Sequence, residues 1–514
     1  MKSSLFSSPN PQSSTMPRER KLLCTGVRGF DEILHGGLPQ GHLYLIEGNP
    51  GTGKTTLGLQ FLLEGIRNGE RAMYVTLSES EEELKETIDA HGWSPESLLI
   101  CEMATPEEDL KREAQYTVFH PSEVELADTM AAIFKEIDAV RPQRLVCDSL
   151  SELRMLARDP LKYRRQILAL KRHLAGQDCT TLLLDDGTAE GGSDLQLQSI
   201  AHGVFRLDTL NRDYGINRRR VQICKVRGSA FSEGFHDYTI QKGGISIYQR
   251  LVAAEHKPGF ERKSVPSGMQ ELDDLFRGGI DTGTSTLLMG PAGCGKSTVA
   301  FQYAYSAAQR GEKSLIFTFD ESANTLLHRA RHLNMDPDLY LKAKVLEVQQ
   351  IDPAELSPGQ LVARIQRVVE EESLRVLVID SMNGLLNAMP NEQFLAMQLH
   401  ELFAYLGQQG IATILTLAQH GLIGTAMQAP IDLSYLADTV LLFRYFERAG
   451  QIRQALSVLK KRSGAHERTI RELIFEKGRV YVGQPLTDFE GVLTGVPRLL
   501  DGISRSGNAP LAGD

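Results

Sequence analysis

The sequence predicts an α/β protein built from two tandem copies of one domain, each a mostly parallel, twisted sheet flanked by helices. Two glycine-rich phosphate-binding motifs occur in the chain, and the residues around the first recur around the second at a constant distance. Apolar strand-like segments alternate with helix-like segments in each copy, as a parallel sheet requires. With 514 residues, the chain is long enough for two or three domains.

Each glycine-rich motif fits the pattern G-x-x-x-x-G-K-[ST]. In such a loop, successive backbone N–H groups turn toward phosphate oxygens, the lysine reaches the terminal phosphates, and the hydroxyl binds Mg²⁺. The alternative is a glycine turn without a ligand, but two matches in matching surroundings favour binding and turnover of nucleoside triphosphates. The candidate nucleotide-binding residues are Gly48, Asn49, Pro50, Gly51, Thr52, Gly53, Lys54, Thr55 and Thr56 in the first copy, and Gly290, Pro291, Ala292, Gly293, Cys294, Gly295, Lys296, Ser297 and Thr298 in the second.

A spacing of 242 residues relates the two copies, because Lys296 follows Lys54 by that distance and Glu321 follows Glu79 by the same one. One offset held over such a length indicates duplication of a domain. The predicted organisation is a disordered N-terminal tail (1–20), a first domain (21–249), a linker (250–262), a second domain (263–497) and a flexible C-terminal tail (498–514).

The elements of both copies follow the same order along the chain. A strand leads into the phosphate-binding loop, and a helix with one apolar stripe follows, ending near Asn68 and Gly69 in the first copy. A second strand ends in carboxylates, and a third apolar strand ends in aspartate, so that ligands meet at the carboxyl ends of the strands. The expected strands are 43–47, 72–77 and 144–148 in the first copy, and 285–289, 314–319 and 375–380 in the second.

The third strand of each copy ends in a candidate metal ligand, Asp148 or Asp380. A carboxylate beside the phosphate loop can hold Mg²⁺ directly or through water, together with the loop hydroxyl of Thr55 or Ser297. The alternative is an aspartate that only terminates its strand. The order of each aspartate after its own loop favours the metal role.

Acidic residues after the second strand form the candidate catalytic centre. The second copy has Asp320 and Glu321, whereas the first has Ser78 and Glu79 and so lacks one acid. An acid at this place can orient or deprotonate the nucleophile that attacks the terminal phosphate, which Ser78 cannot do at neutral pH. The alternative interpretation is that these charges only begin the next helix.

Two basic pairs lie late in each copy, Lys225 with Arg227 and Lys460 with Arg462. Cations at strand ends can neutralise charge on a transferring phosphate, and in a ring they can come from a neighbouring subunit. The alternative is a solvated hairpin edge, which the arginine run at 218–220 supports.

The composition, with 41% hydrophobic and 24% charged residues, is that of a globular protein. Asp and Glu number 65 and Lys and Arg 56, and the net charge of −9 makes nucleic acid an unfavoured partner. The six cysteines are scattered without a C-x-x-C pair, which fits a reducing cytoplasm. No apolar run approaches 18 residues, and residues 1–20 lack a signal-peptide core, so neither a membrane span nor a leader is expected.

These motifs resemble the KaiC family, the tandem RecA-like ATPases and autokinases of the bacterial circadian clock. The resemblance covers roughly residues 21–497 and includes the Gly-Gly-Leu-Pro-x-Gly segment at 36–41, the loops, the second-strand acids and the basic pairs. It implies two tandem RecA-like P-loop domains stacked as tiers of a homohexameric ring. ATP and Mg²⁺ would lie at subunit interfaces, and the basic pairs would reach the ATP from the next subunit.

The resemblance also implies a different activity for each tier. The first tier hydrolyses ATP, and Ser78 stands where the family usually has an acid, so we expect hydrolysis there to be slow or to depend on Glu79. The second tier phosphorylates its own adjacent acceptors, with one of its second-strand acids as general base. These acceptors fall on Ser434 and Tyr435, of which Ser434 is the candidate phosphoacceptor and Tyr435 replaces the expected threonine.

The leading prediction is therefore a cytoplasmic ATPase and serine/threonine autokinase, a phosphorylation-controlled signalling or clock switch with clock or signalling proteins as partners. One alternative is a nucleotide-assembled ring scaffold with little turnover, because ATP that binds only the assembled interface favours the ring by mass action. Another is a DNA-dependent ring ATPase, since RecA-like folds also make recombinases and helicases, although the acidic net charge disfavours it.

Overall fold

The computed structural model describes residues 21–94, 96–103, 121–157, 159–187, 195–211, 215–256, 259–388, 395–419, 433–476, 478–493 and 498–499. The chain divides into two units, Met1–Asn211 with Asn217–Gln249, and Arg212–Ile216 with Arg250–Asp514. The predicted N-terminal tail lies outside the described residues, as does the predicted C-terminal tail from residue 500 onward. Arg498–Leu499, expected within that tail, instead form β24, because their backbones pair with β23 (Phe489–Glu490).

A nine-stranded sheet forms the centre of the first unit, in the order β11-β10-β9-β8-β3-β7-β6-β4-β5. The strands from β8 to β5 in this order run parallel, and β9, β10 and β11 extend the sheet as antiparallel hairpins. The strands are β3 (Leu43–Gly48), β4 (Ala72–Thr76), β5 (Leu99–Glu102), β6 (Arg144–Asp148), β7 (Thr180–Asp186), β8 (Gly203–Leu210), β9 (Arg218–Val226), β10 (Phe235–Gln241) and β11 (Gly244–Tyr248).

The second unit repeats this arrangement in the order β16-β15-β17-β18-β14-β19-β20-β21-β22. Its first six strands are parallel and the last three are antiparallel, which confirms the predicted α/β fold of two mostly parallel sheets. The strands are β14 (Ser285–Gly290), β15 (Ser314–Thr318), β16 (Leu346–Gln350), β17 (Val376–Asp380), β18 (Ala412–Ala418), β19 (Thr439–Arg448), β20 (Gln451–Lys461), β21 (Arg471–Glu476) and β22 (Arg479–Pro485).

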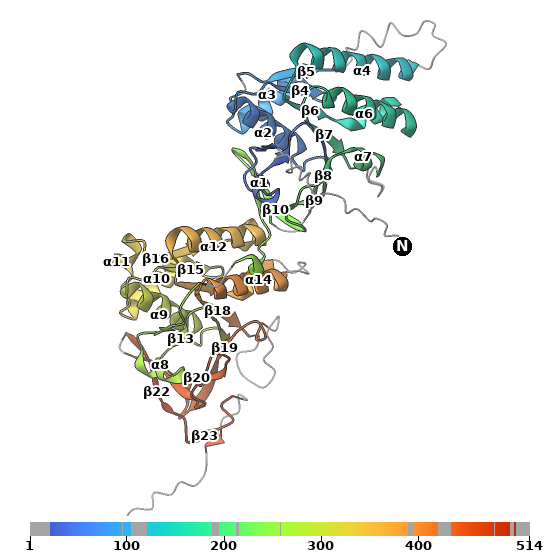
Figure 1. Cartoon of the computed structure of the whole chain (residues 1–514). Helices are drawn as coiled ribbons and strands as arrows, with labels where there is room; N and C mark the ends of the chain where they lie inside the picture. The colour runs from blue at the N-terminus through green and yellow to red at the C-terminus, as the bar shows by residue number, and fades with distance from the viewer. Residues whose placement is uncertain are drawn as a thin grey trace, which may run out of the picture. The chain divides into compact units, whose positions relative to one another are not determined.

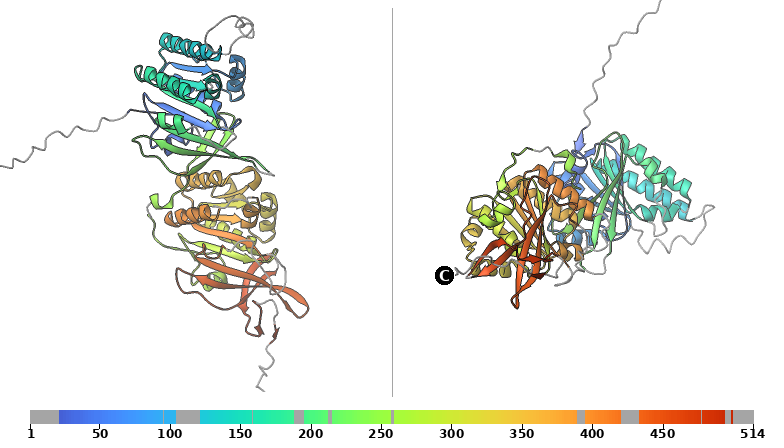
Figure 2. Two further views of the ribbon diagram at one scale, coloured as in Figure 1. Left: turned by 90° about the vertical axis from the view of Figure 1, so that its right-hand side faces the viewer. Right: turned by 90° about the horizontal axis from the view of Figure 1, so that it is seen from below.

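Helices cover both faces of each sheet (Figures 1 and 2). Alternate residues of β3 point to opposite faces, so Tyr44 and Ile46 join the core under α2 while Leu43 and Leu45 join the core under α6. The helices of the first unit are α1 (Phe30–Ile33), α2 (Lys54–Arg67), α3 (Glu81–Ala90), α4 (Pro121–Val140), α5 (Leu150–Ala157), α6 (Pro160–Ala175) and α7 (Leu195–Ile200). Those of the second are α8 (Gln270–Leu275), α9 (Lys296–Gln309), α10 (Ala323–His332), α11 (Asp338–Lys342), α12 (Pro358–Glu372), α13 (Met382–Ala388) and α14 (Leu395–Gln408).

Short strands and 3₁₀ turns complete each unit. Each Gly-Gly turn lies between a two-residue strand and its antiparallel partner, and the 3₁₀ turns are η1 (Ala253–Glu255) and η2 (Pro353–Glu355). The two-residue strands are β1 (Leu22–Leu23), β2 (Leu38–Pro39), β12 (Ser264–Val265) and β13 (Ile280–Asp281). The predicted linker 250–262 includes Leu251 and Ala253, whose side chains are buried in the core of the second unit. The predicted helix end near Asn68 is confirmed, since α2 ends at Arg67.

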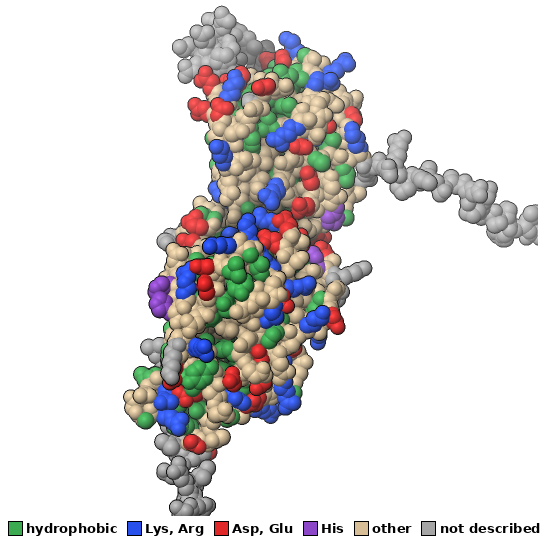
Figure 3. Space-filling view, turned by 90° about the vertical axis from the view of Figure 1, so that its left-hand side faces the viewer, with side chains coloured by type: hydrophobic (Ala, Val, Ile, Leu, Met, Phe, Trp, Pro, Cys, Tyr) green, Lys and Arg blue, Asp and Glu red, His purple; other side chains and the backbone are tan. Residues whose placement is uncertain are grey.

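Charged side chains of both signs are interspersed on the face shown in Figure 3, so neither sign dominates there among the described residues. A single-sign basic field is the usual footprint of a nucleic-acid partner. Within the described part of the chain, no helix has both the length and the apolar character that a membrane crossing needs.

Candidate active sites

The first phosphate loop connects β3 to α2 and closes over its own lysine. Gly51 and Gly53 have φ values of 79° and 92°, a left-handed region that glycine enters without steric cost. Lys54 is buried, and its Nζ donates hydrogen bonds to the carbonyl oxygens of Gly48 at 2.8 Å and Asn49 at 3.2 Å. The same Nζ lies 2.7 Å from Oδ1 of Asp186, so a carboxylate holds the lysine at this site.

The second loop connects β14 to α9 with the same backbone geometry but without that carboxylate. Gly293 and Gly295 have φ values of 76° and 102°. The Nζ of Lys296 donates to the carbonyl oxygen of Pro291 at 2.7 Å, and Lys296 forms no ion pair with any residue that the structure describes. Burial lowers the pKa of the Lys296 amine, against the opposing influence of Cys294 and Asp380.

A tyrosine from a strand late in each unit, β10 or β19, holds the phosphate loop by a hydrogen bond. The hydroxyl of Tyr238 donates to the carbonyl oxygen of Thr52 at 2.7 Å, and the hydroxyl of Tyr445 donates to that of Ala292 at 3.0 Å. The thiol of Cys294 is buried and donates to Pro291 O at 2.9 Å, and burial raises its pKa. Strands far along the chain therefore fix the backbone on which phosphate binding depends.

Each loop hydroxyl lies beside the aspartate that was expected to bind metal with it. Thr55 Oγ1 donates to Asp148 Oδ2 at 2.8 Å, and Ser297 Oγ donates to Asp380 Oδ1 at 3.1 Å. Neighbouring hydroxyl and carboxylate oxygens are donors that Mg²⁺ accepts, so the residues present fit this ion at both sites. Burial raises the pKa of Asp148, although hydrogen bonds from neighbouring hydroxyls oppose the shift.

Two further hydroxyls, which the motifs did not indicate, contact the same carboxylates. The hydroxyl of Tyr74 in β4 donates to Asp148 Oδ2 at 2.5 Å, and the hydroxyl of Thr416 in β18 donates to Asp380 Oδ1 at 2.5 Å. They come from different strands of the two sheets, so the offset of 242 residues does not relate them. Only the pairing of the strands brings them to the site.

The candidate catalytic acids differ between the two sites. Glu79 is half-buried, and burial, reinforced by the charge of Asp148, raises the pKa of its carboxyl. Glu321 accepts two hydrogen bonds from the guanidinium of Arg329, at 2.6 and 2.9 Å. Asp320 is exposed and accepts a hydrogen bond from the hydroxyl of Ser381. At the second site the arginine therefore holds Glu321, and Asp320 is the more accessible acid.

Asp186 is a site residue that the sequence analysis missed. It ends β7, where it lies opposite Gly48 of the phosphate loop. Burial would raise the pKa of its carboxyl, but hydrogen bonding to Lys54 and the charge of that lysine outweigh burial and lower the pKa. The signal was present in the sequence, because Asp185 and Asp186 directly follow an apolar strand.

The basic pairs bind corresponding backbone carbonyls in the two units. Lys225 donates to Gln198 O and Arg227 to Ser199 O, the latter at 2.6 Å. In the second unit Lys460 donates to Ser434 O at 2.8 Å, and Arg462 donates to Tyr435 O at 3.0 Å. The acceptor positions are equivalent, because Gln198 and Ser434 each lie five residues before the strand, β8 or β19, that pairs with the loop strand.

These contacts lie at the opposite end of the sheet from the loop of the same unit. Val440 pairs with both Leu287 and Lys460, near the start of β14, whereas the loop begins at Gly290, the end of that strand. Ser434 precedes β19 altogether, so about 15–20 Å of strand separates it from its own loop at ~3.3 Å per residue. Ser434 is half-buried and the Tyr435 side chain is 56% exposed.

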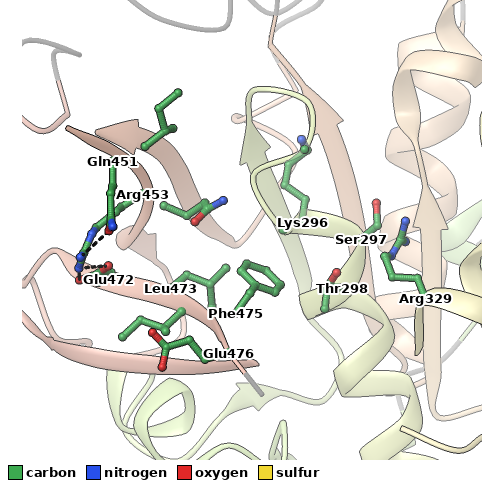
Figure 4. A pocket seen from close by; sticks show the side chains of 15 residues that line it. Lys296, Ser297, Thr298, Arg329, Gln451, Arg453, Glu472, Leu473, Phe475 and Glu476 are labelled. Atoms are coloured by element: carbon green, nitrogen blue, oxygen red, sulfur yellow. Dashed lines mark hydrogen bonds and ion pairs between the residues drawn. The ribbon is translucent and has the colours of Figure 1, made fainter. Parts of the chain in front are cut away.

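A cavity of about 580 Å³ lies beside the second loop. Figure 4 shows Lys296, Ser297 and Thr298 on one side of it and Leu473 and Phe475 facing them from the antiparallel ribbon. Arg329 also lines the cavity, and Arg453 forms an ion pair with Glu472 at its far edge. An apolar wall opposite a phosphate-binding loop suits a ligand with an aromatic ring and an anionic chain.

Comparison with known proteins gives matches over both units. The model of the KaiC ATPase family matches residues 23–252 and 265–487. The circadian clock protein KaiC3 of Synechocystis sp. is 26% identical over 483 residues, covering 92% of this chain and 94% of that protein. The circadian clock oscillator protein KaiC of Thermostichus vulcanus is 27% identical over 501 residues, covering 96% and 94%. The circadian clock protein KaiC2 of Synechocystis sp. is 27% identical over 492 residues, covering 92% and 84%.

Proposed function

Because the chain belongs to the KaiC family of ATPases, we propose that it hydrolyses ATP in its first domain and transfers phosphate to Ser434 in its second. The phosphorylation state of Ser434 then acts as a signalling or clock switch. Membership of an ATPase family supports nucleotide binding in both domains. The transfer to Ser434 is supported above all by one observation, the position of Ser434 and its basic neighbours at the far end of the sheet from their own loop.

A group at that end lies too far from the nucleotide of its own loop, so it would serve the nucleotide of another copy of the chain. Ser434, Lys460 and Arg462 are held together by hydrogen bonds to one backbone segment, so they would approach a neighbouring loop as one group. We infer a ring in which each subunit presents this segment to the next, and the family resemblance suggests six subunits in two tiers. Partner proteins would then bind the phosphorylated ring differently from the unphosphorylated one.

The second-domain residues suit the steps of phosphoryl transfer. The loop N–H groups and Lys296 bind the terminal phosphates, and the oxygens of Ser297 and Asp380 would hold Mg²⁺, which when bound supplies positive charge to those phosphates. The Oγ of Ser434 bonds to the γ-phosphorus, and Asp320 accepts the proton of that hydroxyl. The bond from the γ-phosphorus to the bridging oxygen breaks, which releases ADP. Lys460 and Arg462 neutralise the charge that develops.

The first-domain residues suit hydrolysis. Thr55 and Asp148 would hold Mg²⁺, Lys54 binds the terminal phosphates, and Glu79 orients the attacking water. Lys225 and Arg227 neutralise the developing charge as Lys460 and Arg462 do, since they bind equivalent carbonyls. No second-strand acid assists Glu79, because position 78 is serine.

A complementation experiment tests transfer between copies. Lys296→Ala removes nucleotide binding but keeps the acceptor, and Ser434→Ala removes the acceptor but keeps nucleotide binding. When the two variants are mixed as nucleotide-free protein and then assembled with Mg-ATP, we expect phosphate on Ser434 of the Lys296→Ala chain. Peptide-mapping mass spectrometry identifies the modified chain.

Each variant incubated alone is the control and should stay unphosphorylated on residue 434. Phosphate on Lys296→Ala incubated alone would contradict the proposal. So would a failure of the wild-type chain to incorporate phosphate while it releases phosphate into solution, which would leave an ATPase without kinase activity.

A further inference from the structure

The two sites carry the same number of acids at different places. The first site has Glu79, Asp148 and Asp186, and the second has Asp320, Glu321 and Asp380. Strand register aligns the differing positions, because Asp186 pairs with Gly48 just as Ala418 pairs with Gly290. Relative to the second site, the first therefore lacks an acid at position 78 and has an additional one at position 186.

The contacts of Asp186 resemble those of the acid that position 78 lacks. The serine after each metal-site aspartate takes part in both. Ser381 donates to Asp320, whereas Ser149 hydrogen-bonds to Ser151, and Ser151 Oγ donates to Asp186 Oδ2 at 3.0 Å. Hydroxyls thus link the serine after the metal-site aspartate to one further acid at each site, directly to Asp320 at the second site and through Ser151 to Asp186 at the first. Asp186 is 38% exposed, and its Oδ1 lies 2.7 Å from the Nζ of Lys54, the residue that binds the terminal phosphates.

We propose that Asp186 is the second acid of the first site, which orients the attacking water together with Glu79 in place of an acid at position 78. This rests on the proposed ATP hydrolysis. In the empty loop Asp186 binds Lys54 at 2.7 Å. When Lys54 binds the terminal phosphate instead, the hydrogen bond from Ser151 keeps the Asp186 carboxylate beside the γ-phosphate.

The reaction at the first site is hydrolysis of the γ-phosphate of ATP. The water oxygen bonds to the γ-phosphorus, the bond from phosphorus to the bridging oxygen breaks, and ADP and inorganic phosphate leave. The proton of the water passes to Glu79 and from there to solvent, while Asp186 accepts the second O–H of the water as a hydrogen bond. Two acceptors fix the orientation of the water, which one acceptor alone leaves free to rotate.

The test uses the full chain with Lys296→Ala, so that phosphate release reports the first site. Asp186→Asn keeps the shape of the side chain and removes its charge. We expect kcat to fall about 10–100-fold with KM changed less than about threefold, less than for loss of a general base, because Asp186 orients the water and Glu79 accepts its proton. Adding Ser78→Asp should then restore kcat at least about fivefold, whereas Ser78→Ala should not. A purely structural role would not predict that rescue.

The opposite reading is that Asp186 only blocks Lys54 in the empty loop. In that case Asp186→Asn would lower KM and leave kcat unchanged or higher, and this result would overturn the assignment. If Asp186→Asn fails to fold, Ser151→Ala removes the hydroxyl that holds the carboxylate and should lower kcat about 3–10-fold; an unchanged kcat would also overturn it. No phosphate release by the parent chain would overturn the proposed hydrolysis as well, whereas an inert Asp186→Asn overturns this assignment alone.

Discussion

The two phosphate-binding sites share their local geometry and differ in the groups that neighbouring strands and helices bring to it. Both lysines fold back onto their loops, and both loop hydroxyls meet an aspartate. Yet a carboxylate holds Lys54, and none among the described residues holds Lys296. Motifs of contiguous residues were retained after duplication, while the side chains reached through strand pairing diverged, and these are the ones that can give the two sites different chemistry.

The acids show the same contrast. Arg329 clamps Glu321, but the equivalent helix position in the first domain, 242 residues earlier, is Thr87, which carries no charge. Glu79 therefore has a half-buried carboxyl without an arginine partner in the described residues. The second site therefore has two acids after β15, each with a different partner. The first site has Glu79 after β4 and Asp186 at the end of β7.

The largest expected effect tests what the two sites share. Asp148→Asn and Asp380→Asn remove the carboxylate beside each loop hydroxyl, and each should lower the activity of its own domain about 10²–10³-fold, because metal-held charge stabilises the transferring phosphate. Phosphate release in the Lys296→Ala background reports the first domain, and phosphate on Ser434 in the chain with Lys296 intact reports the second. Equal loss of both activities in either variant would contradict separate sites.

The next effect separates the two acids of the second site. Because Arg329 holds Glu321 and leaves Asp320 accessible, Asp320→Asn should slow phosphate incorporation on Ser434 about 10²-fold. Glu321→Gln should slow it less than about fivefold, since that residue is a hydrogen-bond acceptor for the arginine. Initial rates by intact-mass spectrometry measure both variants, and the reverse order would show that Glu321 is the base.

A smaller effect comes from giving the second site the carboxylate of the first. Ala418→Asp places an acid at the register position of Asp186, where it should pair with Lys296 and compete with phosphate for it. We expect nucleotide affinity at the second site to weaken about 3–10-fold, the cost of one charge-assisted contact. Titration with a fluorescent ATP analogue in the Lys54→Ala chain measures it, with Ala418→Asn as the uncharged control. Tighter binding would refute the competition.

The smallest effect concerns stability and has opposite signs at the two sites. Burial raises the pKa of Glu79 above its ordinary value of 4.5, so its contribution to stability is complete below that pH and is lost as pH rises through the raised pKa. Glu79→Gln should therefore raise the free energy of unfolding at neutral pH, by at most about 1 kcal/mol because solvent screens the half-buried group. Glu321→Gln should lower it by up to about 1 kcal/mol through loss of the arginine pair.

Urea unfolding at neutral pH and near pH 4.5 measures both variants. The gain of Glu79→Gln should shrink at the lower pH, because the raised pKa leaves more of the wild-type carboxyl protonated there. A gain of the same size at both pH values would show that packing, and not charge, is responsible.

The sequence by itself determined the loops, the duplication and the α/β class. The glycines, the lysine and the hydroxyl follow one another within eight residues, so their spacing alone predicts a phosphate-binding turn. The apolar strand segments predict a parallel sheet. The aspartates at the ends of β6 and β17 were also predictable, since parallel strands bring their carboxyl ends to one edge.

Only the tertiary structure decided which side chains meet that edge. Tyr74, Thr416 and Arg329 reach the sites through the register of strands and the packing of a helix, and no motif marks them. The sequence places Asp186 at the end of an apolar strand, but only the pairing of β7 with β3 brings it to Lys54. The separation of each basic pair from its own loop has the same origin. The last strands turn back antiparallel, so residues late in the chain return to the end of the sheet where the loop strand begins, and contacts set by such long-range pairing cannot be read from local spacing.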